Sequence, residues 1–175
     1  MAIVLLLLGT VPAAATHELD GQRHQLQGTQ VGLFDTSDLE TSADAAFFIR
    51  HGWTFLDVRR DNAREAARRL AVYMDDDAYR FELSMSVNGG AELNVALTRT
   101  IVRPFTCHAP GGDQPCWLKQ FHVEFAGGTF APGQEVVFTG RWYGWFSNDD
   151  ILAACPGPAC QGPLALTLSR KLIFK

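Results

Sequence analysis

The chain has 175 residues, 47% of them hydrophobic, and a formal net charge of -4. This length and hydrophobic share suffice for one packed domain with an N-terminal extension, and they exclude wholesale disorder. The excess of Asp and Glu over Lys and Arg argues against a general nucleic-acid binder, which needs positive charge to neutralise phosphates. We therefore expect no nucleic-acid partner.

An apolar segment, residues 1–15, opens the chain without a basic residue. This segment is shorter than the ~20 apolar residues that span a membrane, and Pro12 lies inside it. Two interpretations stay open: a signal peptide that is removed, or a retained packing helix whose apolar residues contact other copies of the chain. Both predict an exported protein. The residues assigned to this assembly contact are Ile3, Val4, Leu5, Leu6, Leu7 and Leu8.

Residues 16–36 are polar and form either a continuation of this helix or a connector. Ser37 and Glu40 then fit a capping box, which marks a helix start. Apolar positions recur at three- and four-residue steps as far as Met74, with arginines between them, as expected for an amphipathic helix. The sequence therefore predicts an Ala- and Arg-rich helix over residues 37–77.

From residue 78 the apolar pattern changes to a period of two, which predicts strands. The turn sequence Asn88-Gly89-Gly90 predicts a hairpin, with a return strand that ends before Pro104. About five strands joined mostly by short links imply a largely antiparallel arrangement. The expected fold class is α+β: the N-terminal apolar segment and the long helix pack on a mostly antiparallel sheet or a small β-sandwich within residues 78–175. The expected strands cover residues 79–87, 93–102, 117–125, 136–146 and 164–174.

The four cysteines form two close pairs, Cys107 with Cys116 and Cys155 with Cys160. Turn residues separate the members of each pair, so local disulfides are favoured. A four-thiolate zinc site is the alternative, but the Cys-x8-Cys spacing does not suit it. Disulfides indicate an oxidising compartment outside the cytoplasm. We expect neither a metal nor a cofactor.

The chain carries no nucleophile elbow, zinc-protease motif or phosphate-binding loop, so no catalytic residue is assigned and the protein is expected not to be an enzyme. Strand alternation sends Trp142 and Phe146 inward and leaves Arg141, Tyr143 and Trp145 facing outward. Exposed aromatic residues beside a cation can stack on sugars or bind a protein partner. These three residues are therefore the candidate ligand or partner surface, and burial beneath a loop or another subunit is the alternative.

The layout resembles that of type IV pilin-like proteins, including minor pilins of tight-adherence systems. The stretches ADAAFFIRHGW and NAREAARRLAVYM resemble the Ala/Arg-rich helices of such proteins. The resemblance implies a structural subunit of a surface filament or envelope assembly. Its partners would be copies of itself or other pilin-like subunits, with membrane contact during assembly. The alternative function is a secreted β-sheet module that binds carbohydrate or protein through its exposed aromatic residues.

Overall fold

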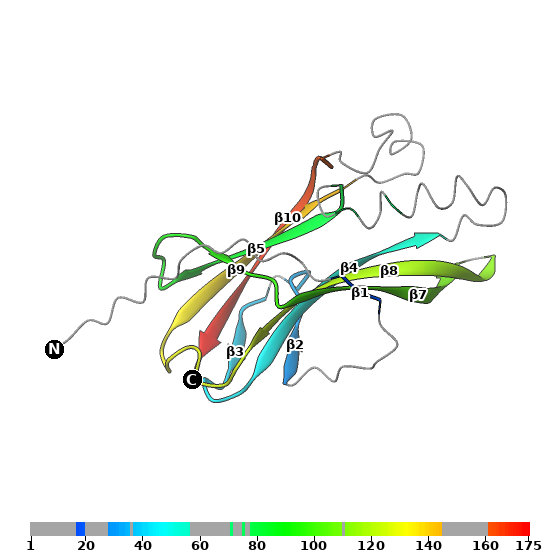
Figure 1. The fold of residues 1–175 in the computed structure, drawn as a ribbon. Coiled ribbons are helices and arrows are strands. Elements are labelled where there is room, and N and C mark those ends of the chain that lie inside the picture. The colour runs from blue at the N-terminus through cyan, green and yellow to red at the C-terminus, as the bar shows by residue number, and fades with distance from the viewer. Residues whose placement is uncertain are drawn as a thin grey trace.

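The computed structural model describes residues 17–19, 28–35, 37–56, 71, 75, 78–109, 111–144 and 161–175. These residues form ten strands in two layers (Figure 1). The strands are β1 (His17–Leu19), β2 (Thr29–Val31), β3 (Leu39–Thr41), β4 (Phe47–Leu56), β5 (Arg80–Val87), β6 (Leu93–Val95), β7 (Arg99–Ala109), β8 (Gly112–Phe125), β9 (Glu135–Tyr143) and β10 (Leu164–Phe174).

Each layer is a five-stranded sheet with antiparallel central strands and short outer strands. The first sheet has the order β1-β7-β8-β4-β2, and the second has the order β3-β10-β9-β5-β6. Three short strands pair in parallel: β1 with β7, β2 with β4, and β3 with β10. Both sheets are therefore mixed. The long β7–β8 hairpin reaches beyond the body of the sandwich (Figure 1).

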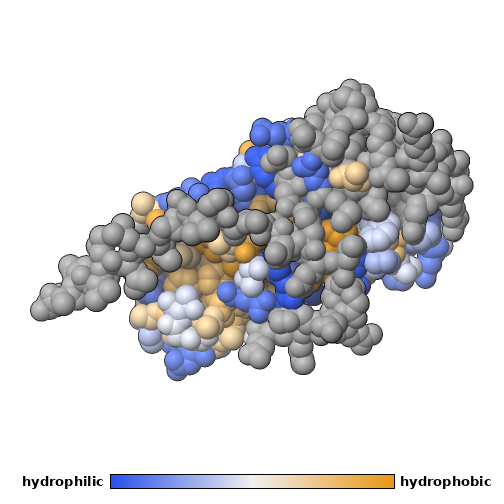
Figure 2. All heavy atoms as spheres, in the orientation of Figure 1, coloured by the Kyte–Doolittle hydropathy of each residue, from blue (hydrophilic) through white to orange (hydrophobic). Residues whose placement is uncertain are grey.

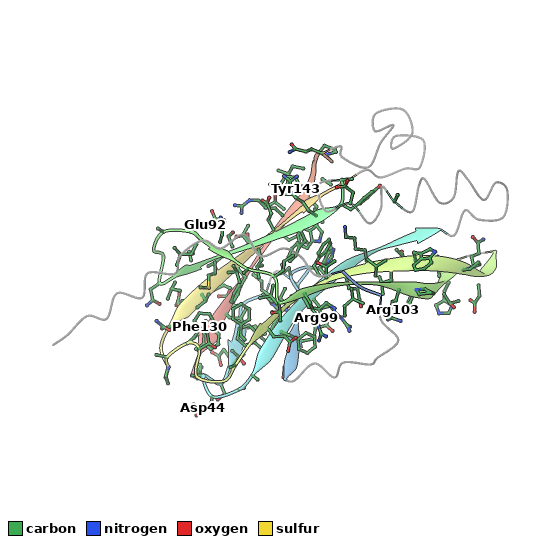
Figure 3. All side chains as sticks on the ribbon, viewed as in Figure 1. Asp44, Glu92, Arg99, Arg103, Phe130 and Tyr143 are labelled. Atoms are coloured by element: carbon green, nitrogen blue, oxygen red, sulfur yellow. A yellow bond between two sulfur atoms is a disulfide. The ribbon has the colours of Figure 1, made fainter. Side chains whose placement is uncertain are left out.

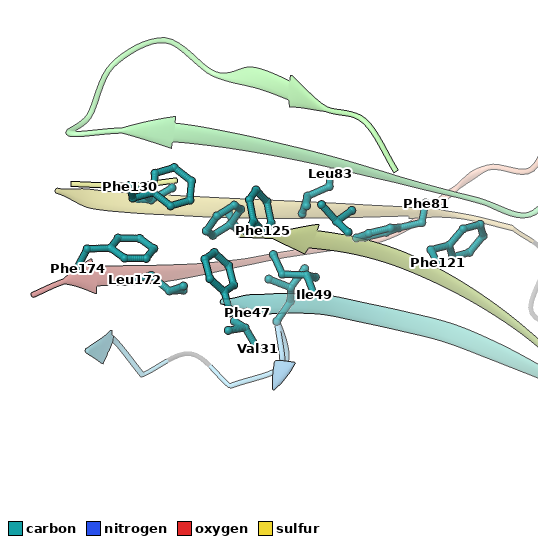
Figure 4. Close-up of a cluster of buried hydrophobic side chains, with 14 of the residues drawn as sticks. Val31, Phe47, Ile49, Phe81, Leu83, Phe121, Phe125, Phe130, Leu172 and Phe174 are labelled. Atoms are coloured by element: carbon teal, nitrogen blue, oxygen red, sulfur yellow. The ribbon is translucent and has the colours of Figure 1, made fainter. Parts of the chain in front are cut away.

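The strands form because their side chains alternate between a buried and a more accessible face, as β9 shows along its whole length. The buried faces of the two sheets pack on each other, which is the arrangement of a β-sandwich. Phenylalanines dominate one end of this core (Figure 4). The rings of Phe47 and Phe125 stack with centroids 4.7 Å apart, and those of Phe130 and Phe174 lie 4.7 Å apart.

Hydrophobic and hydrophilic residues also occupy different parts of the surface. On the face shown in Figure 2, hydrophobic residues gather in the half of the molecule that holds the C-terminus, and hydrophilic residues lie around them. Phe130, in the link between β8 and β9, is buried and closes this end of the core.

The expected α+β class is wrong, because the described part of residues 37–77 contains strands β3 and β4 in place of a helix. Ser37 does not cap a helix: its backbone N–H and hydroxyl both donate to Asp35 Oδ1, at 3.0 and 2.7 Å. Aromatic and β-branched residues in β4 favour a strand. The arginine-rich stretch that suggested the helix lies outside the described residues apart from Ala71 and Asp75.

The prediction that residues 93–102 form a single return strand is also wrong. The chain leaves the second sheet after β6 and enters the first sheet as β7, so the two halves of this stretch belong to different sheets. Pro104 does not end β7. Among the described residues, the strand that pairs with this side of β7 reaches only residues 100–102, and a strand edge tolerates a residue without an N–H.

The predicted turn after β5 is confirmed. Asn88 and Gly89 adopt positive φ values of 51° and 68°, and Gly90 donates its N–H to the carbonyl of Val87. Asn88 also joins this turn to β9: its N–H donates to Glu135 O at 2.7 Å, and its Oδ1 accepts from Glu135 N–H at 2.9 Å.

We expect Asn88→Ala to lower the free energy of unfolding by about 1–2 kcal/mol, because alanine resists positive φ and loses the bond to Glu135. Asn88→Gly should cost less, since it relieves the backbone strain and loses only the side-chain bond. Urea denaturation of both variants measures the difference. Equal stability of the alanine variant and the parent chain would contradict the role assigned to Asn88.

Candidate functional site: the outer face and the edges of the second sheet

Two of the three residues predicted to form a partner surface lie together on the second sheet. Trp142 is fully buried, so its neighbours Arg141 and Tyr143 face away from the core on the outer face of the sheet. Both are half-buried. Figure 3 labels Tyr143 on this sheet. Trp145 lies outside the described residues.

Tyr143 is held by charged residues of the neighbouring strand β5. Its hydroxyl donates to Glu82 Oε2 at 3.0 Å. The guanidinium carbon of Arg80 lies 3.9 Å from the centre of the Tyr143 ring, and Arg80 Nε pairs with Glu82 Oε1 at 3.1 Å. One face of the tyrosine ring is therefore already occupied by a cation.

Arg141 is similarly engaged. Its guanidinium donates to Ser84 Oγ at 2.9 Å and pairs with Glu92 Oε1 at 2.7 Å. Ser84 donates its hydroxyl to the same Glu92 carboxylate. The hydrogen bonds from Ser84 and Arg141 hold the pKa of Glu92 below its usual value. Positive and negative groups thus neutralise each other on this face, and its chemistry is hydrogen bonding and stacking.

The edges of the second sheet carry exposed leucines that sequence reasoning missed. Strand β3 pairs only with residues 172–174, at the end of β10. At the start of β10, Leu164 and Leu166 are 55% and 36% exposed. On the opposite edge, Leu93 in β6 is 53% exposed. The sequence signal was available, because residues 162–169 lack the charged side chains that normally protect a sheet edge.

A loop between β2 and β3 closes one side of the sandwich. Leu33 enters the core over Gly140, where a Cβ would come within 2.6 Å of Leu33 Cδ1. Phe34 lies outside it, 61% exposed, with its ring centre 4.9 Å from that of His51. The His51 ring in turn meets Trp142 edge-on at 4.2 Å. The loop therefore covers a histidine that faces the core.

Burial lowers the pKa of His51 to about 4 from its ordinary value of 6.5. The unfolded chain therefore takes up a proton as the pH falls below 6.5, whereas the folded chain does so only near 4. The stability that neutral His51 contributes is therefore complete above pH 6.5. It is lost as the pH falls from 6.5 to about 4.

We expect the free energy of unfolding to fall by about 2 kcal/mol from about pH 7.5 to about pH 4.5 through His51, after allowance for the partial solvent contact of its ring. His51→Gln removes the titrating group, so the variant should lose much less over this interval. Urea denaturation of both proteins at both pH values supplies the comparison. The same loss in the variant as in the parent would exclude His51 as the cause.

Cys107 and Cys116 form a disulfide across the β7–β8 hairpin, with Cα atoms 5.8 Å apart. This confirms one of the two predicted local pairs. Cys155 and Cys160 lie outside the described residues, as does the apolar run of Ile3, Val4, Leu5, Leu6, Leu7 and Leu8.

Other chemistry on the described residues is limited. In this part of the chain no group of three or more His, Cys, Asp or Glu side chains is placed to hold a metal ion. The described residues contain no helix that is long and apolar enough to cross a membrane.

No family model matches this chain, and neither a curated protein nor a solved structure matches it. The candidate site of this chain is therefore the outer face and the edges of the second sheet.

Proposed function

We propose that this protein is an exported, non-enzymatic structural subunit of a surface filament or envelope assembly, built from copies of the same chain. The observation that carries the proposal is the exposure of leucines on both edges of one sheet, at Leu93 on one side and at Leu164 and Leu166 on the other. A subunit with two different adhesive edges can contact two neighbours, and such head-to-tail contacts form rings or open filaments.

Two features of the chain add support. The Cys107–Cys116 disulfide is of a kind that persists in oxidising compartments, in keeping with export. The apolar residues 1–15 would add a second contact between copies if they are retained. Of the two stretches that resemble pilin-like helices, residues 43–53 contain a turn and part of β4, so the proposal rests on the sheet edges.

Light scattering and negative-stain microscopy of the full chain test this function. The parent should form assemblies that grow with concentration. Leu6→Asp places a charge in the apolar segment and should prevent assembly, whereas Leu6→Ile should not, and both should keep the circular dichroism of a folded sandwich. A parent chain that stays monomeric at every concentration would overturn the proposed function. Normal assembly of Leu6→Asp would remove residues 1–15 from it.

A secreted binding module is the second candidate, because Arg141 and Tyr143 share one face of the sheet. A sugar or a peptide would have to stack on the side of the Tyr143 ring that Arg80 leaves uncovered. Tyr143→Ala should then abolish retention on a glycan array or on a protein partner, with Tyr143→Phe retaining most of it. Unchanged retention of the alanine variant would reject this candidate.

A further inference from the structure

The first open edge of the second sheet belongs to β10. Residues 164–169 pair with β9 on one side, and within the described chain no strand pairs with them on the other. Residues 162–169 contain no charged side chain. A strand edge that is both apolar and uncharged is a template for pairing with another strand.

The second open edge belongs to β6, at the opposite side of the same sheet. This strand pairs with residues 83–85 of β5, and no other described strand pairs with it. Residues 93–97 also lack charge. Residues 162–169 and residues 93–97 therefore match in character, since neither stretch carries a Lys or Glu that would repel a neighbouring strand.

The two edges also match in direction and in face. Each of the contacts β10–β9, β9–β5 and β5–β6 is antiparallel, so β10 and β6 run in opposite directions. Leu166 pairs with the buried Trp142. Leu93 pairs with Met85, which pairs with the buried Phe138. Both leucines therefore lie on the core-facing side of the sheet, so they can pack together when two sheets are joined edge to edge.

We propose that β10 of one copy pairs antiparallel with β6 of the next copy, so that the second sheet continues from subunit to subunit. This inference rests on the proposed function and names its contact. Each copy offers both edges, and the pairing uses one edge of each partner. The contact is therefore heterologous and repeats without closing unless the rotation between copies makes a ring. Pairing through backbone hydrogen bonds is a known mode of strand addition.

Crosslinking with single cysteines tests the pairing directly. Leu166→Cys and Leu93→Cys should each stay uncrosslinked with a short bis-maleimide, because each variant places its thiols far from one another. A mixture of the two variants should crosslink. The parent chain gives the background of the native cysteines, and Phe105→Cys, an exposed site on the first sheet, is the matched control. Crosslinking of Leu166→Cys with itself would overturn the inference in favour of symmetric β10–β10 pairing.

Charge at the edge gives a second readout. Leu166→Lys and Leu93→Lys should each raise the concentration of half-maximal assembly by about tenfold or more, since each puts an ammonium in the joint. Phe105→Lys should leave it unchanged, and thermal melting should verify that all three variants fold. If the parent assembles but the edge variants behave like Phe105→Lys, the pairing is wrong and the proposed function stands. If the parent does not assemble, the proposed function falls with it.

Discussion

Replacing Trp142 by alanine is expected to lower the free energy of unfolding by about 3–5 kcal/mol. The indole is fully buried between the sheets and lies against His51 and Phe81, with ring centres 4.2 and 4.9 Å away. Removing it leaves a large cavity where these rings meet, and the close-packed surroundings can collapse only in part. Urea denaturation at neutral pH measures the loss.

Trp142→Phe is the matched control for this prediction. The smaller ring leaves a smaller cavity, and it also removes the indole Nε1, a buried donor for which the described residues offer no acceptor. The phenylalanine variant should therefore lose clearly less stability than the alanine variant. Equal losses in the two variants would show that ring packing is not what Trp142 contributes.

Arg170→Ala should lower the free energy of unfolding by about 2–4 kcal/mol, because the guanidinium is buried and ties the loop between β2 and β3 to β10. It donates to the carbonyls of Gly32 and Ser37 at 2.8 and 3.3 Å, and to Asp35 Oδ2 at 2.9 Å. Without it these carbonyls lose their partner, and the loop that brings Leu33 into the core loosens. Denaturation measures the total loss, and hydrogen exchange of residues 31–35 locates it.

Two variants separate the hydrogen bonds of Arg170 from its charge. Arg170→Lys keeps the charge but cannot reach all three acceptors, so its stability should lie between those of the parent and the alanine variant. Asp35→Asn alters only the exposed end of the cluster and should change stability much less. An alanine variant whose loop amides exchange as slowly as those of the parent would contradict this role of Arg170.

The loop held by Arg170 also illustrates what local sequence cannot reveal. Arg170 and Asp35 are 135 residues apart in the chain, and each looks like an ordinary surface charge in the sequence. The same holds for Glu82 and Tyr143, which are 61 residues apart. These contacts depend on which strands become neighbours, and strand order is a property of the whole fold.

The failure of the expected helix has a more local cause. Phe47, Phe48 and Ile49 in β4 are all buried, so this part of the strand has no polar face and no period-two pattern. An apolar run of this kind cannot be assigned to helix or strand by its periodicity. The Ala- and Arg-rich residues that follow then favoured the helical interpretation over the whole segment.

The sequence by itself determined the features that depend on neighbouring residues. Alternation identified β5, β9 and β10, Asn88 and Gly89 identified the turn, and the short separation of Cys107 and Cys116 identified the disulfide. Only the tertiary structure decided that β6 and β7 lie in different sheets, because the apolar positions Leu93, Val95, Leu97 and Ile101 keep the same period-two alternation across the change of sheet. The tertiary structure also decided which strands have an unpaired edge, since an edge is defined by the neighbours that a strand lacks.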